Sequence, residues 1–475
     1  MLSLNHLAAI LTLAVCCYVV YQCYFSPLAV FPGPVAAKLT KAWRARLLYN
    51  GYWHRDLPEL HKRYGPVVRI GPDELSIGDP EAFRTIYRVN NAFTKPHSHA
   101  LLKGTRSFDL VNEQDEKLHG IQRRLVARPY SMESMRRLEP HMDELLDMML
   151  RRFDEAAMSR QAIDLGYWIQ LFAFDVIGAV SFGRHFGFVA SGTDRGIFAR
   201  LERALNSSAW VVHVRWFFWL HQEVIMPLFG NFLAINDRNG FFHAFAEEQV
   251  KRRRIEGGEK DIVGQLFQLQ KGKTEITDTV IGFMMTSNVF AGSDTTSATL
   301  RAVFLSLLKA PRTMAKLRHE LESCRSIDRT GGRFSFEEAE SCHYLQAVIY
   351  EAMRLYPAVP GNLERNVPSE GMTICGKFVP GGTVVGSSAW VIHQMQEVWG
   401  DDAAEFRPER WLDNDRVGEL RRFFFGFGGG TRTCIGRSQC LSSPSLESAL
   451  FFLLSSFSFP NIQKHPVCFC GVEKV

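Results

Sequence analysis

The sequence predicts a mainly α-helical (α+β) fold, in which one large helical domain with small peripheral β-sheets follows an N-terminal transmembrane helix. Three observations predict it. A long apolar run stands near the N-terminus, apolar residues recur at spacings of three and four from about residue 113 to 309, and short β-like runs lie on either side of that stretch. We therefore expect one α+β domain rather than βαβ repeats.

The composition fits a large folded domain. The chain has 475 residues, of which 46% are hydrophobic and 22% charged, so it can bury a sizeable core and is not expected to be disordered. A net charge of +5 is too small for a typical nucleic-acid-binding protein, and no nucleic-acid partner is expected. Ten scattered cysteines without a Cys-x-x-Cys pair argue against a disulfide framework.

The first 26 residues predict a membrane anchor. Residues 7–25 are almost wholly apolar, and a helix of that length spans about 28 Å, close to the thickness of the bilayer core. A cleaved signal peptide is the alternative, but the run is long for one and lacks a basic start. The cations that follow place the body in the cytosol by the positive-inside rule, and they are Lys38, Lys41, Arg44 and Arg46.

The predicted body extends over residues 27–436. β-like runs stand at 67–70 and 75–77, a long helix is expected over 277–309, and further β-like runs stand at 372–378 and 383–386. The segment 210–220 holds five aromatic residues. Such a run is most often part of a core, and the alternative is a second surface that dips into the membrane.

The most informative stretch is 427–436, in which glycines surround Cys434 and Arg432 stands two residues before it. Glycines let the backbone approach a flat ligand and point N–H groups at a thiolate, and an arginine can neutralise an anionic group of that ligand. A structural glycine loop with an inert cysteine is the alternative. A phosphate loop is excluded because no Gly-Lys-Ser/Thr follows.

Four motifs in the order expected of one family make the stretch more specific. They are residues 291–296 (AGSDTT), 351–354 (EAMR), 406–411 (FRPERW) and 427–436 (FGGGTRTCIG). Together they resemble the cytochrome P450 family. The phrases around 174–187 and 390–411 look most like fungal members, including the pisatin-demethylase-like group that acts on secondary metabolites.

The resemblance implies a role for particular residues. Cys434 would be the axial thiolate ligand of haem b, and Asp294 and Thr295 would deliver protons during oxygen activation. Glu351, Arg354 and Arg410 would form a buried triad that shapes the cysteine loop. The implied cofactor-binding residues are His119, Arg123, Arg365, Phe427, Arg432 and Gly436. On the central helix alone, a small-residue crossing and a threonine bonded to its own backbone explain 291–296 equally well.

The implied activity is that of a haem-thiolate monooxygenase, which inserts one oxygen atom of O2 into a lipophilic small molecule. No flavin or nicotinamide signature is evident, so electrons would come from NADPH through a separate NADPH-cytochrome P450 reductase. The implied location is the endoplasmic reticulum membrane, with a single span and a cytosolic catalytic domain. A haem-thiolate isomerase or dehydratase is an alternative, which the presence of Asp294 and Thr295 disfavours.

Residues 437–475 depart from the family pattern. The tail is rich in Ser, Phe, Leu and Cys, and Pro444 stands where a regular helix is expected. Our hypothesis is that it derives from a shifted reading frame or a retained intron. A catalytically impaired or non-enzymatic product is therefore a further alternative.

Overall fold

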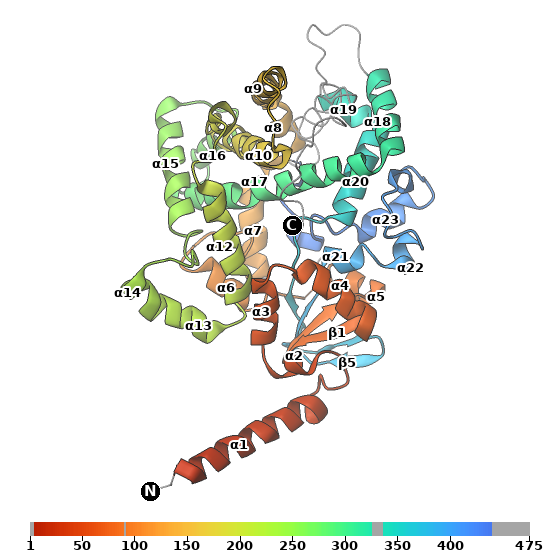
Figure 1. The fold of residues 1–475 in the computed structure, drawn as a ribbon. Coiled ribbons are helices and arrows are strands. Elements are labelled where there is room, and N and C mark those ends of the chain that lie inside the picture. Colours follow the sequence, from red (N-terminus) through yellow and green to blue (C-terminus); the bar gives the residue numbers. More distant parts are fainter. Residues whose placement is uncertain (1–3, 90–91, 325–335, 439–475) are drawn as a thin grey trace.

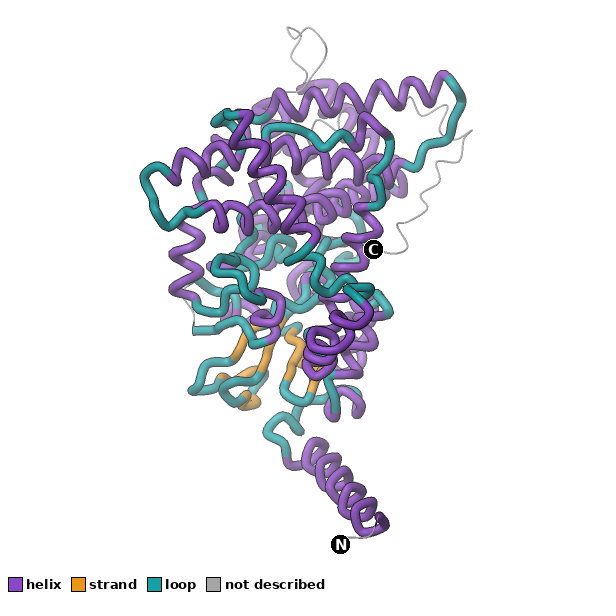
Figure 2. Tube along the Cα trace, turned by 90° about the vertical axis from the view of Figure 1, so that its left-hand side faces the viewer, coloured by secondary structure: helices purple, strands orange, loops and turns teal. Residues whose placement is uncertain are grey.

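A computed structural model describes residues 4–89, 92–324 and 336–438, so most of the tail predicted to be atypical (437–475) lies outside the described residues. Helices make up most of the body, as the sequence predicts (Figure 1). The strands gather at the end of the molecule nearest the N-terminal helix, and the helices fill the rest (Figure 2).

The helices of the N-terminal half are α1 (Leu4–Val20), the π-helix η1 (Tyr21–Phe25), α2 (Val35–Leu39), α3 (Ala42–Tyr49), α4 (Trp53–Tyr64), α5 (Pro80–Ile86), α6 (Ser98–Lys103), α7 (Glu116–Val126), η2 (Arg128–Tyr130), α8 (Met132–Arg136), α9 (Glu139–Met158), α10 (Leu165–Phe182), α11 (Phe188–Ser191), α12 (Ile197–Val211), α13 (Arg215–Leu220), η3 (His221–Ile225) and α14 (Met226–Phe229). Those of the C-terminal half are α15 (Phe241–Glu256), α16 (Ile262–Gln270), α17 (Asp278–Lys309), α18 (Pro311–Cys324), α19 (Phe336–Ser341), α20 (His343–Leu355), α21 (Ala389–Ile392), α22 (Gln396–Trp399), η4 (Pro408–Trp411), α23 (Val417–Phe423) and η5 (Gly430–Arg432).

The core is built around α10 and α17. The helix α17 has 32 residues and begins where predicted, because the Thr277 hydroxyl caps it by accepting the N–H of Val280 at 3.2 Å. Nearly all of α10 is buried against it, which explains why α10 is apolar enough to pass as a membrane span by composition. The 291–296 motif lies on α17 and therefore in the centre of the domain, next to α10.

Two small sheets form from the predicted β-like runs and from one strand, β3, that was not predicted. The four-stranded sheet has the order β1 (Val67–Gly71), β2 (Glu74–Ile77), β6 (Val384–Gly386) and β3 (Arg365–Asn366). The β2–β6 pair is parallel and aligns Leu75 with Val385, whereas the other two pairs are antiparallel. A second, antiparallel pair joins β4 (Met372–Ile374) to β5 (Lys377–Val379). The larger sheet joins segments that lie about 300 residues apart in the sequence.

The apolar N-terminal helix projects from the body (Figure 1). None of its window over Leu4–Phe25 is buried, and its length and composition suit a membrane span. Its inner end is bonded to the sheet by Arg69, a fully buried residue of β1. The guanidinium donates to the carbonyl of Gln22 at 2.9 Å and to its side-chain oxygen at 2.6 Å, and the Arg69 N–H donates to the carbonyl of Pro32 at 2.7 Å.

The aromatic segment 210–220 does not become part of the core as a whole. In α13 no residue is buried, and Trp216 is 69% exposed. Apolar exposure continues into α14, where Phe229 is 72% exposed. These side chains lie at the surface, so the interpretation of the whole segment as core is wrong for α13.

Candidate active site

The cysteine loop follows α23 and is fixed by its glycines. Gly430 has a φ of +64°, and a Cβ at this position would lie 2.7 Å from the carbonyl oxygen of Tyr87, so only glycine fits without strain. The N–H of Cys434 donates to the carbonyl of Phe427 at 2.9 Å, which closes the loop on itself. At Gly430 the close approach is thus to the protein's own backbone, which is what the alternative of a structural glycine loop predicts.

The Cys434 side chain is exposed to solvent. Desolvation raises the pKa of the Cys434 thiol, while a hydrogen bond from the N–H of Gly436 and the positive charge of Arg123 lower it by less. The protein therefore supplies an N–H donor and a cation toward the sulfur but does not by itself deprotonate it. A metal ion bound to the sulfur would complete the deprotonation.

Positive side chains converge beside this loop. Arg123 on α7 donates to the carbonyl of Thr433 at 2.7 Å, and Arg365 on β3 is buried. Burial, together with the charges of Arg365 and Arg432, lowers the pKa of Lys95 to about 7. Burial and the charges of Arg432, Arg123, Lys95 and Arg365 lower the pKa of His119 to about 3.

This crowding of cations fits a negatively charged ligand, because bound carboxylates would relieve the repulsion. Arg432, which the resemblance assigns to the cofactor, also has a partner within the protein. Its Nη2 and Nε atoms donate to the Glu116 carboxylate at 2.7 Å and 3.0 Å, so a protein carboxylate neutralises it. The residues present, a thiol with an N–H donor beside a cation cluster, fit a haem with its propionates.

The residues of the predicted motif face two different sides of α17. Ala291 is exposed and its immediate neighbours are partly buried, whereas a Cβ on Gly292 would lie 2.4 Å from Ile177 of α10. The glycine is therefore required by the helix crossing, and the room expected from both residues comes from Ala291. The Thr295 hydroxyl donates to the carbonyl of Ala291 at 2.8 Å, which is the local bond that the alternative interpretation predicted.

Asp294 faces α10 rather than its own helix. Its carboxylate accepts a hydrogen bond from Gln170 at 3.4 Å, and Gln170 in turn accepts one from Arg301 at 2.8 Å. Burial raises the pKa of the Asp294 carboxyl, and the more distant Arg301 lowers it by less. Asp294 can thus hold a proton more readily than an exposed aspartate.

Tyr130 connects α17 to the neighbourhood of the cysteine. Its hydroxyl donates to Asn288 of α17 at 2.8 Å, and burial raises its pKa, with a smaller contribution from the nearby Cys434. Asn288 also donates to Ser181 of α10 at 3.2 Å. Tyr130 therefore lies where α10, α17 and the cysteine loop come close together.

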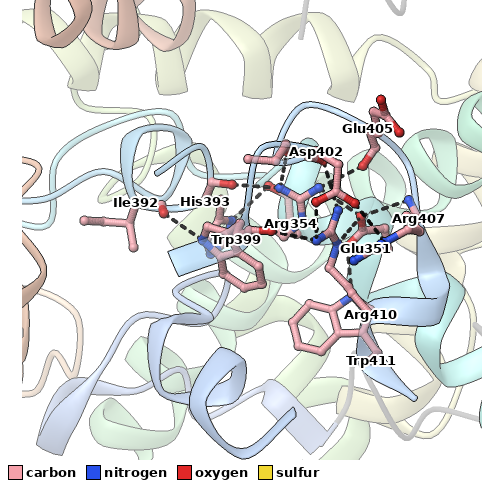
Figure 3. A network of polar contacts seen from close by, with 11 residues as sticks. Glu351, Arg354, Ile392, His393, Trp399, Asp402, Glu405, Arg407, Arg410 and Trp411 are labelled. Atoms are coloured by element: carbon pink, nitrogen blue, oxygen red, sulfur yellow. Dashed lines mark hydrogen bonds and ion pairs between the residues drawn. The ribbon is translucent and has the colours of Figure 1, made fainter. Parts of the chain in front are cut away.

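The three residues of the predicted triad lie together (Figure 3), and all three are buried. Glu351 accepts from Arg354 at 2.9 Å and from Arg410 at 2.9 Å, and these three side chains are at most 2% exposed. The same carboxylate accepts from the Trp411 indole at 2.9 Å and from the backbone N–H of Arg407 at 3.0 Å. Such a network fixes geometry more than it adds stability.

Sequence reasoning missed three residues of this region: Lys95, Glu116 and His393. His393 lies in the polar network of Figure 3, between Arg354 and the segment that leads to the cysteine loop. The partner of Glu116 is 316 residues away in the sequence. No local pattern marks any of the three.

Comparison with known proteins is consistent with this geometry. The family model described as Cytochrome P450 matches residues 40–469. The chain is 48% identical to the cytochrome P450 monooxygenase hepC of Aspergillus oryzae, over 97% of this chain and 92% of that protein. It is 32% identical to a cytochrome P450 monooxygenase of Aspergillus terreus, over 86% of each chain. It is also 32% identical to a pisatin demethylase of Fusarium vanettenii, over 88% of this chain and 81% of that protein.

Proposed function

The chain belongs to the cytochrome P450 family and is an oxygen-incorporating oxidoreductase, and from this premise we propose its finer function. It is a membrane-anchored monooxygenase that hydroxylates or epoxidises a lipophilic small molecule in a fungal secondary-metabolite pathway. The observation that carries the proposal is the Cys434 thiol, which has the Gly436 N–H and the Arg123 charge directed at it.

The bound group would be haem b, held by Cys434 through its iron and by the cation cluster through its propionates. When bound, the haem supplies oxygen activation and the transfer of one oxygen atom to a carbon of the substrate. Lys95, Arg365 and the N–H of the neutral His119 are the donors available to its carboxylates, because Arg432 is already paired with Glu116.

Residues of α17 would bind and transfer the protons that the reaction needs. Asp294 holds a proton that its burial favours, and Gln170 and Arg301 keep its carboxylate oriented from α10 and α17. The Thr295 hydroxyl stands one turn from Ala291 and can exchange its local bond for one to a bound ligand. The exposed Ala291 leaves this helix face free for substrate.

Electrons would come from NADPH through NADPH-cytochrome P450 reductase. Exposed cations on α7, in η2 and on α23 support docking of an acidic protein surface, and they are Lys117, Arg124, Arg128, Arg421 and Arg422. They lie on segments that adjoin the cysteine loop in the sequence or bond to it through Arg123.

The proposed location is the endoplasmic reticulum membrane, with α1 as the single span and the body in the cytosol. Two of the four cations that follow α1 are used in the fold, because Lys41 pairs with Asp73 at 2.8 Å and Arg44 pairs with Glu364 at 2.6 Å. The exposed aromatic and aliphatic side chains of α13 and α14 support a second contact with the membrane.

The test compares membranes that carry the parent chain, Cys434→Ser and Cys375→Ser. Cys375 is an exposed free cysteine on the turn between β4 and β5, so its substitution is the matched control. We expect the parent and Cys375→Ser to show a thiolate-type Soret band after reduction and addition of carbon monoxide, together with NADPH-dependent oxygen consumption. We expect Cys434→Ser to show neither. An unchanged band in Cys434→Ser would refute the proposal.

A further inference from the structure

We infer that His393 is a positioning residue that couples the buried Glu351–Arg354–Arg410 triad to the cysteine loop through a hydrogen bond accepted by its Nε2 atom. The inference rests on the proposed haem-thiolate function only for its spectroscopic readout. The contacts that carry it belong to the protein alone.

His393 follows α21 and is fully buried. Its Nε2 atom lies 2.8 Å from the backbone nitrogen of Phe425, and its Nδ1 atom lies 2.9 Å from the carbonyl oxygen of Arg354. A backbone N–H can only donate, so Nε2 must be the unprotonated acceptor. It follows that Nδ1 carries the hydrogen and donates to Arg354, so the two partners assign one tautomer.

The imidazole keeps this form over the working pH range. Burial and the positive charge of Arg354 lower the pKa of His393 to about 3. Its ring stacks on Phe424 with centroids 5.4 Å apart and an interplanar angle of 9°, and it meets the edge of Trp399 at 5.7 Å. The ring is thus held in place while both nitrogens are used.

The two partners of His393 lead to different parts of the site. Arg354 is bonded to Glu351 and also donates to the carbonyls of His393 and Ala403, at 2.7 Å and 2.6 Å (Figure 3). Phe425 stands two residues before Phe427, whose carbonyl accepts the N–H of Cys434 at 2.9 Å. One imidazole therefore joins the triad to the start of the loop that presents the thiol.

Phe425 is held from its side chain as well as from its backbone. Its ring packs against Phe83 at 4.9 Å and Tyr87 at 4.6 Å, and Tyr87 is the residue whose carbonyl meets Gly430. Loss of the Nε2 acceptor would leave a buried N–H without a partner at the point where the loop begins. An unsatisfied buried N–H costs free energy, so the backbone of Phe425 would shift to bring this N–H to water, and the start of the loop would shift with it.

Two near-isosteric substitutions separate the two hydrogen bonds. The side-chain amide of glutamine reaches the position of Nε2 and can accept from Phe425, whereas that of asparagine reaches only the position of Nδ1 and can donate to Arg354. The inference therefore predicts that His393→Gln keeps the loop in place and that His393→Asn does not. His61→Asn is the matched control, because His61 contacts Gly65 and Ser76 through both ring nitrogens at 3.1 Å and 2.8 Å, away from the cysteine loop.

The experiment uses purified full-length protein loaded with haem. Hydrogen–deuterium exchange of the amide of Phe425 is the readout that does not depend on the haem chemistry. We expect exchange to be at least about tenfold faster in His393→Asn than in the parent, because a buried N–H has lost its acceptor. We expect His393→Gln and His61→Asn to remain close to the parent.

The second readout is the share of haem that gives a thiolate-type band with carbon monoxide, at equal haem content. We expect that share to fall several-fold in His393→Asn and to be retained in His393→Gln. Equal behaviour of the two variants, including failure of both to fold, would overturn the inference, because His393 would then only fill space. If the parent itself gave no thiolate-type band, the proposed function would fail while the exchange comparison still decided the role of His393.

Discussion

Replacing Glu351 by glutamine is expected to unfold the domain or to leave it close to unfolding. Five N–H groups donate to this carboxylate: two from Arg354 and one each from Arg410, Trp411 and the backbone of Arg407. Glutamine has nearly the same shape but presents an NH2 group to some of these donors. It also removes the negative charge that two buried guanidinium groups share.

The size of the loss in unfolding free energy follows from the burial of the two arginines that pair with Glu351. The side chains of Arg354 and Arg410 are 0% and 2% exposed, so neither can recover water in the folded state. Removing one partner of a buried ion pair costs about 3–5 kcal/mol. Arg354 keeps three carbonyl acceptors, and Arg410 keeps those of Trp399 and Asp402, which limits the loss. We expect about 5 kcal/mol, a large part of the roughly 5–15 kcal/mol that stabilises a typical domain.

The assay is urea unfolding of the haem-loaded protein, followed by tryptophan fluorescence and by haem absorbance. Glu59→Gln is the matched control, because its pair with Lys62 is 66–68% exposed, and we expect it to change the free energy of unfolding by less than about 0.5 kcal/mol. A loss below about 1 kcal/mol in Glu351→Gln would refute the reasoning, since the buried charges would then have found other compensation.

Three further outcomes follow from the geometry. Gly430→Ala is expected to lose about 1–3 kcal/mol and part of its haem, because its φ is +64° and the new Cβ meets Tyr87; a spectrum with full haem content would contradict this. Asp294→Asn is expected to keep its fold and haem but to lose the fall in kcat with rising pH that a proton-donating carboxyl produces; an unchanged pH profile would contradict it. Burial raises the pKa of Glu74, but the charges of Arg44, His213 and Lys41 outweigh burial and lower that pKa to about 2. The ion pairs of Glu74 therefore contribute fully to stability above the unfolded pKa of 4.5, and this contribution is lost as the pH falls toward 2. Urea unfolding at pH 6 and about pH 3.5 should therefore show a smaller acid loss in Glu74→Gln than in the parent, and equal losses would contradict the assignment.

Local patterns were sufficient to predict the elements that depend on local chemistry. The capping residue Thr277 and the apolar period predicted α17, and β-branched runs between turn residues predicted β1, β2 and β6. The glycines around Cys434 predicted a tight loop because backbone conformation is decided within a few residues. The order of four motifs, rather than any one of them, identified the family.

Contacts between distant segments could not be predicted in this way. The pairing of Arg432 with Glu116 is one example, because Glu116 is brought to it by the folding of α7 against the loop. Gly292 was expected to make room for a ligand, and instead it allows α10 to approach through Ile177. The exposure of α13 also depends on what lies next to it, which the composition of the segment does not reveal.

The attachment of α1 to the body has a mechanical consequence. Because Arg69 donates to both the main-chain carbonyl and the side-chain oxygen of Gln22, the apolar N-terminal helix meets the sheet through a stiff joint rather than a flexible linker. A stiff joint fixes the tilt and height at which the body would sit above a bilayer, and with them the angle at which α13 and α14 would face the lipid. If α1 spans a membrane as proposed, an unrelated spanning helix in place of residues 1–26 would keep the protein there but would leave that angle free.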